Sequence, residues 1–428
     1  MRRIARENAG CAFLAACGCA AMAWLGLYGF AWNDYETEAR PAFAALTHGH
    51  VLEFLRLVPA YGGSLIERAP FALLPSLWGG GALAVYRAVA APCLLATAIL
   101  GVWLLARMRG AGGPRLARAV ALGVCVANPI TLRALELGHP EELMGASLCV
   151  AAVLLAADRS PGRDRSLLAG ALLGLAIANK EWALLAAGPV VLALPPGRRR
   201  RCLASAGVSA AVVLVPLMLV NSGSFLASTR AAAAPGASAI FQPWQLWWFF
   251  GHHGALVHGA FGAVKPGYRV APAWTGTVSH PVVLGAGLAI AASLWPRSSR
   301  RALREQDALL ALALGLLLRC LLDTWDTSYY MLPFLLALLA WELGGAPRRP
   351  PLLALACSVL AWLSFQWLPE HASADVQSAA FLAWSVPFAG WLGLRLFSAG
   401  HRASAEVPPA GAAYETTVSS LGRLVRTS

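Results

Sequence analysis

Long apolar runs recur along the chain and are separated by short polar segments. Several runs approach or exceed about 18 residues, the length at which a helix crosses a bilayer core of about 30 Å. The apolar positions are continuous rather than alternating, which predicts helices and not strands. The sequence therefore predicts an all-α polytopic membrane protein with about 12 membrane segments, some of them short and broken. The predicted spans are 10–32, 82–106, 116–134, 143–157, two arms within 167–195, 203–220, 281–295, 306–322, 329–344, 351–367 and 378–396.

Composition and charge agree with this class. Of the 428 residues, 58% are hydrophobic and only 13% are charged, about half the charged fraction of a typical soluble domain. The net charge of +13 comes from short basic loops beside apolar runs, such as "GRRRR" and "PRSSRRALR". Such loops mark the cytoplasmic side of a membrane, so they predict cytoplasmic N- and C-termini and a lipid bilayer, not nucleic acid, as the partner.

The same alternation predicts the domain organisation. Residues 1–396 form a single integral-membrane domain, and the polar tail 397–428 is predicted to be disordered and cytoplasmic. Two long loops, 33–80 and 221–280, are expected on the extracytoplasmic face. The first contains "GHVLEFLRLV" and "IERAPFALLPSLW", which are typical of interfacial amphipathic segments.

One apolar stretch, 167–195, lies between two basic loops and is interrupted by Asn179, Lys180 and Glu181. Each arm has about a dozen residues, or roughly 18 Å of helix, which is too short for a full crossing. We therefore expect a short hairpin whose tip holds Lys180 below the outer surface. An ionisable side chain at that depth is a functional candidate, although Lys180 could equally pair with Glu181 or extend towards water.

Ionisable and aromatic side chains gather in the predicted outer loops. A structural protein has no evident reason to concentrate its polar chemistry on one face, so these residues are candidates for a substrate site. They are Asp34, Glu36, Arg40 and Arg68 in the first loop, His139 and Glu141 in the second, Lys180 in the hairpin, His252 in the long loop, and Asp323, Asp326 and Tyr330 near residue 325.

The long loop also has an aromatic run, 241–250, followed by His252, His253 and His258. The run is typical of an interfacial belt, and it is also compatible with the wall of a lipid or sugar site. The histidines have no carboxylate at ligand spacing, so no metal site is predicted.

A carboxylate just above a membrane suits one reaction class well. A general base there can deprotonate a sugar hydroxyl, which then attacks an activated anomeric carbon. If the leaving group is a lipid phosphate, a lysine or arginine can stabilise its developing charge.

Three stretches carry a resemblance to a known family: "NDYETEARP", "NPITLRALELGHPEELMGASLCVAAVLLA" with the following "AGALLGLAIANKEWALLAAGPVVLALP", and "DTWDTSYYMLPFLLALLAWE". Over most of residues 20–345 the chain resembles the GT-C-type glycosyltransferases, and within them the bacterial polyprenyl-phosphate-mannose-dependent mannosyltransferases. The resemblance implies a GT-C-like bundle, Asp34 as catalytic base, Lys180 facing the donor phosphate, and His139 and Glu141 lining the same cavity. This sequence reads Gly138-His139-Pro140 where the family usually has Gln or Asn after the glycine, which leaves the donor open.

The identity of the base also stays open, because Glu36 and Glu38 lie in the same loop as Asp34. If the loop is helical, Glu36 faces Arg40 at i,i+4, which favours Asp34 as the base. The alternative role for Asp34 is a helix N-cap.

These observations predict an enzyme with an extracytoplasmic active site, and the resemblance implies that it is inverting and lies in a bacterial plasma membrane. It would move a sugar, mannose by the resemblance, from a polyprenyl-phosphate donor to a lipid-linked or cell-envelope glycan acceptor, with no cofactor besides that donor. The alternative is a transporter or flippase of lipid-linked glycans or other anionic substrates. A transporter needs ionisable groups near the midplane, whereas these groups cluster at one face.

Overall fold

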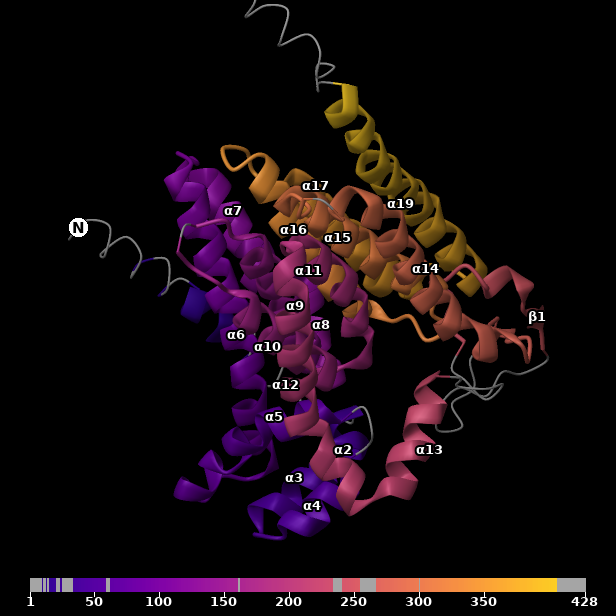
Figure 1. Ribbon diagram of the computed structural model, residues 1–428. Helices are drawn as coiled ribbons and strands as arrows, with labels where there is room; N and C mark the ends of the chain where they lie inside the picture. Colours follow the sequence, from indigo (N-terminus) through magenta and orange to yellow (C-terminus); the bar gives the residue numbers. More distant parts are fainter. Residues whose placement is uncertain are drawn as a thin grey trace, which may run out of the picture.

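The computed structural model describes residues 15–20, 34–58, 62–160, 162–233, 241–254, 267–299 and 301–405, together with residues 10, 13 and 24. Helices make up most of this part of the chain (Figure 1). The first half contains α2 (Asp34–Glu38), α3 (Arg40–Thr47), α4 (Val51–Leu57), α5 (Gly63–Ala72), η1 (Leu74–Trp78), α6 (Ala82–Gly110), α7 (Arg115–Val126), α8 (Pro129–Leu137), α9 (Glu141–Ala157), α10 (Ser166–Asn179), η2 (Glu181–Ala186), α11 (Ala187–Ala193) and η3 (Pro196–Arg198).

The second half begins with α12 (Arg199–Val220) and α13 (Ser222–Ala233), followed by a short antiparallel pair of strands. The remaining elements are η4 (Trp248–Phe250), β1 (His252–His253), β2 (Arg269–Val270), α14 (Thr275–Ser298), α15 (Glu305–Leu322), η6 (Ser328–Tyr330), α16 (Met331–Gly345), α17 (Leu352–Trp362), a π-helical turn (Leu363–Trp367), α18 (Leu368–His371) and α19 (Ala374–Ala405).

Six helical stretches among the described residues are long and apolar enough to cross a membrane. The chain is therefore all-α with the composition of a membrane protein, whereas the count of about 12 crossings is not confirmed. Most of the other predicted spans form helices that are shorter or carry more charge, such as α9, α15 and α16. The six stretches are Ala82–Gly110, Arg115–Leu137, Pro196–Val220, Thr275–Ser298, Leu352–His371 and Ala374–Ser398.

The helices divide into an inner and an outer set. Most side chains of α9, α15 and α16 are buried, as expected for helices that are apolar on nearly every side. By contrast, only 17% of the apolar stretch of α12 and 22% of that of α14 is buried. The outer helices therefore present the surface that lipid would cover.

The predicted boundaries match in some places and differ in others. Loop 33–80 folds into α2–α5 and η1, so both segments interpreted as amphipathic are helical. The last helix continues to Ala405, past residue 396 where the final span was expected to end. The predicted first span, 10–32, lies largely outside the described residues, although residues 15–20 are helical.

The basic loops gather at one end of the bundle. Arg107, at the end of α6, forms an ion pair with Glu305 at the start of α15. Arg159, just after α9, donates to the carbonyl oxygens of Ala193 (2.6 Å) and Leu303 (3.3 Å). Loops predicted to share one side of the membrane thus meet, while helices α2–α5 project from the opposite end (Figure 1).

The short hairpin is present. Its two ends meet where Arg198 lies 3.6 Å from Asp164, and α10 stops at Asn179, so that Lys180 lies at the break before η2. Helix α10 packs closely on α12, because a Cβ at Gly170 or Gly174 would lie 2.2 Å from a carbonyl oxygen of that helix. The hairpin therefore holds Lys180 at the end of the bundle away from the basic loops.

Candidate active site

A carboxylate–imidazole–carboxylate chain joins the first loop to the start of α9. His139 Nε2 lies 3.0 Å from Asp34 Oδ2, and His139 Nδ1 lies 2.9 Å from Glu141 Oε1. The Asp34 side chain is 38% exposed, whereas those of His139 and Glu141 are buried. Asp34 is therefore the member of this chain that an incoming molecule can reach.

Local backbone geometry explains why these three residues meet. Gly138 has φ +92°, and a Cβ there would lie 2.5 Å from the Tyr35 backbone nitrogen, so only glycine fits this turn. Tyr35 in turn stacks on Tyr86 of α6, with ring centroids 4.2 Å apart. The Tyr86 hydroxyl donates to the Leu135 carbonyl at the end of α8. These contacts fix α2 against the turn that presents His139.

Two further cations surround Glu141. Arg68 Nη2 lies 3.3 Å from Glu141 Oε2, and Lys180 Nζ lies 3.2 Å from Glu141 Oε1. Asn179 Nδ2 donates to the Glu141 carbonyl (2.9 Å), which fastens the hairpin tip to α9. Sequence segments separated by more than 100 residues thus converge on one buried carboxylate.

His139 carries a positive charge at neutral pH. Burial opposes this charge, but Glu141 and Asp34 outweigh burial and raise the pKa of the imidazole to about 9. Three cations, His139, Arg68 and Lys180, therefore converge on Glu141, and Asp34 and Glu38 line the adjoining pocket. Cations gathered in a buried site can bind an anion.

Arg68 has hydrogen-bonding capacity left over. Its Nε donates to the Ser64 carbonyl (3.0 Å) and its Nη2 to the Ser64 hydroxyl (3.3 Å). Its Nη1 is buried and has no hydrogen-bond partner among the described residues. A small pocket of about 10 Å³, room for about one water, lies beside Arg68 and is also lined by Asp34, Glu38 and Gly138.

A second charged group adjoins the first through Glu142. Arg319 Nη1 lies 3.7 Å from Glu142 Oε2, and the Arg319 guanidinium stacks over the Tyr330 ring at 3.8 Å. Asp323 accepts from the Trp325 backbone N–H at 2.9 Å. Asp326 is fully buried, and neither of its carboxylate oxygens has a partner among the described residues. Glu142 links Asp323, Arg319 and Tyr330 to the neighbourhood of Glu141.

Three of the predicted site residues belong to neither of these two charged groups. Glu36 on α2 and Arg40 on α3 form the expected i,i+4 ion pair, in which Arg40 is exposed and Glu36 is largely covered. His252 is exposed on β1, and no contact in the described part of the chain joins it to Asp34 or its partners. The neighbouring His253 instead lies 3.4 Å from Asp375.

Sequence reasoning missed several residues that build the site. Tyr86 looks like part of an apolar span, and Ser64 and Asn179 carry no motif. Their contacts depend on which face of each helix points inward. Only the positions of Asn179 beside Lys180, and of Ser64 four residues before Arg68, signal a role.

Among the described residues, no group of three or more His, Cys, Asp or Glu side chains is arranged to hold a metal ion. Comparison with protein-family models, curated proteins and solved structures finds no match for this chain.

Proposed function

We propose that this chain is an integral-membrane glycosyltransferase of the GT-C type. It transfers a sugar, mannose by the resemblance, from a polyprenyl-phosphate donor to a lipid-linked or cell-envelope glycan on the extracytoplasmic face. The observation that carries the proposal is the half-exposed Asp34 carboxylate beside a buried, cation-rich recess containing Arg68 and Lys180. A base and an anion site are the two parts that this reaction needs.

In the proposed reaction, Asp34 accepts the proton of an acceptor hydroxyl. The hydroxyl oxygen forms a bond to the anomeric carbon of the donor sugar from the side opposite the phosphate. The bond between that carbon and the phosphate oxygen breaks, and the phosphate leaves with the electron pair. Arg68 and Lys180 stabilise the charge that develops on this leaving group, and attack from the opposite side inverts the anomeric centre.

His139 holds the base in place. As an imidazolium it donates to Asp34 on one side and to Glu141 on the other. Glu141 is surrounded by cations and buried, so it orients His139 and Lys180 and does not reach a substrate. The pocket holds about one water, so a sugar enters only when α2–α5 move away from α9. The return of these helices over the bound sugar then excludes water from the reaction.

The test is a transfer assay in proteoliposomes, with polyprenyl-phosphomannose as donor and a membrane lipid extract as acceptor. We expect a mannosylated lipid and free polyprenyl phosphate with the wild type, and no product with Asp34→Asn. Glu36→Gln is the matched control, because Glu36 is paired with Arg40 and makes no contact with His139 in the described structure, and it should retain transfer.

A transporter gives a different result in the same vesicles. The donor would appear intact on the other leaflet, with its sugar–phosphate bond unbroken. Movement of intact donor without mannosylated product would overturn the proposal. Equal transfer by Asp34→Asn and the wild type would reassign the base to Glu36 or Glu38.

A further inference from the structure

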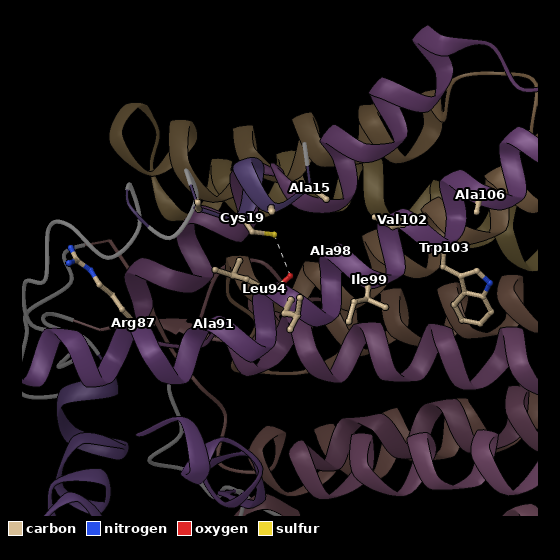
Figure 2. A pocket seen from close by; sticks show the side chains of 13 residues that line it. Ala15, Cys19, Arg87, Ala91, Leu94, Ala98, Ile99, Val102, Trp103 and Ala106 are labelled. Atoms are coloured by element: carbon tan, nitrogen blue, oxygen red, sulfur yellow. Dashed lines mark hydrogen bonds between the residues drawn. The ribbon is translucent and has the colours of Figure 1, made fainter. Parts of the chain in front are cut away.

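A long groove separates the N-terminal helical segment, residues 15–20, from one face of α6. Its volume is about 640 Å³, and small apolar side chains line most of it, among them Ala16, Ala91 and Ala98. Figure 2 shows Arg87 at one end of the groove and Ala106 at the other. The two walls touch where the Cys19 thiol donates to the Leu94 carbonyl oxygen at 3.4 Å.

The groove is separate from the proposed active site. Tyr86, on the inward face of α6, stacks on Tyr35 beside Asp34. The groove uses a different face of the same helix, on which Leu95 and Ile99 are 56% and 60% exposed. A molecule in the groove therefore reaches the lipid-covered surface without entering the recess of Arg68.

Arg87 gives this apolar groove one charged end. The guanidinium lies 5.5 Å from the centre of the Trp24 ring, and no carboxylate of the described residues lies within ion-pair distance of it. At the other end of α6, Arg107 is neutralised by Glu305. A cation without a carboxylate at the end of an apolar surface is stabilised when an anion meets it.

The dimensions match one leaflet of a bilayer. Ala98 follows Arg87 by eleven positions along α6, which is about 16 Å of helix. That is about half of the roughly 30 Å hydrocarbon core of a bilayer. A phosphate at Arg87 would therefore place an acyl chain along Ala91 and Leu94 as far as Ala98, at the middle of the membrane.

We propose that this groove binds one anionic phospholipid, with its phosphate on Arg87 and an acyl chain between residues 15–20 and α6. The lipid completes the packing of the N-terminal segment against the bundle. The apolar groove supplies the affinity for the acyl chain, and Arg87 supplies the preference for a negatively charged headgroup.

The test is native mass spectrometry of the full chain in detergent, titrated with phosphatidylglycerol and with phosphatidylcholine. We expect one phosphatidylglycerol to bind about tenfold more tightly than phosphatidylcholine, since a charge-assisted contact contributes about that factor. Arg87→Gln should abolish this preference. Arg56→Gln, which removes an exposed arginine from α4, is the matched control and should retain it.

A second pair of variants tests the apolar groove without changing any charge. Ala91→Trp fills the groove at an exposed position and should release the bound lipid. Ala211→Trp makes the same change on the exposed surface of α12 and should not. An unchanged preference for phosphatidylglycerol in Arg87→Gln, or unchanged lipid retention in Ala91→Trp, would overturn the proposal. So would displacement of the lipid by polyprenyl phosphate but not by phosphatidylglycerol. None of these readouts depends on sugar transfer.

Discussion

Asp375 and Glu141 are both carboxylates with more than one cationic partner, and they differ in what their partners leave unused. Asp375, at the start of α19, receives two hydrogen bonds of 2.8 Å from Arg269 and a third of 2.8 Å from Trp248. The remaining guanidinium nitrogen of Arg269 donates to the Gly251 carbonyl at 2.9 Å. Around Glu141, by contrast, Arg68 retains a buried nitrogen without a partner in the described structure.

This difference distinguishes an ion-pair cluster that only stabilises the fold from a cluster that can still bind a ligand. The Asp375 cluster pairs its charged groups and holds the β1–β2 strand pair against α19. The Glu141 cluster brings three cations together and leaves Arg68 Nη1 buried without a partner in the described structure, where an unsatisfied charged group is expensive. Such an arrangement is stabilised when an anion joins it. In the proposed function, the first cluster stabilises the fold and the second binds the substrate.

Replacing the arginine of each cluster with glutamine tests the comparison most strongly. Arg68→Gln should weaken binding of polyprenyl-phosphomannose by about 10- to 100-fold, because it removes a buried charge-assisted contact to phosphate. Arg269→Gln removes the same charge from the other cluster and should leave the donor Kd unchanged. Both are measured by donor titration of purified protein. Equal losses in the two variants would show that overall charge, not the recess, governs binding.

The pH dependence of donor binding tests the role of His139. Its pKa is raised to about 9, so the imidazolium is fully present below about pH 6.5 and is lost as pH rises through about 9. Donor affinity should therefore fall by up to about tenfold between pH 8 and pH 10, since one favourable charge disappears. His139→Gln should bind donor weakly and without this transition. The same transition in His139→Gln would assign it to another group.

Asp375→Asn should affect stability and leave turnover intact. Loss of the charge-assisted contacts to Arg269 should lower the apparent Tm by a few degrees, since each such contact contributes about 1.5–3 kcal/mol. Thermal unfolding and sugar transfer are measured on the same preparation. Loss of transfer at temperatures where Asp375→Asn is still folded would remove the distinction between the two clusters.

The smallest effect is expected at the surface. Arg40→Gln breaks the ion pair with Glu36, and exposed pairs of this kind contribute about 0–1 kcal/mol. Donor affinity, transfer and thermal stability should all stay within about twofold or a degree of the wild type. A large loss of donor affinity would mean that Arg40 leaves Glu36 and takes part in binding.

Much of the site could be anticipated from local sequence rules. The charge pattern predicted that the basic loops share one end of the bundle, and the broken apolar stretch predicted that Lys180 lies at a hairpin tip. The i,i+4 spacing of Glu36 and Arg40 gave their pairing. Each of these inferences depends on short-range spacing or on the side of the membrane, which a sequence records directly.

Other features depend on helix rotation and length, which the pattern does not record. Tyr86 supports the first loop only because its face of α6 points inward. Apolar runs in α9, α15 and α16 resemble crossings, yet these helices are short or carry charge, so they do not establish the predicted count. His252 shared a predicted side with Asp34, but membrane side alone does not bring two residues into contact.

The central claim is that Asp34 performs the chemistry while the cations of the recess bind the donor. The most direct measurement is the donor Kd and the transfer rate of Asp34→Asn, determined on one preparation beside the wild type. The account predicts a Kd within about threefold of the wild type and a transfer rate lower by at least about 100-fold, the usual contribution of a general base. A transfer rate equal to that of the wild type would contradict it.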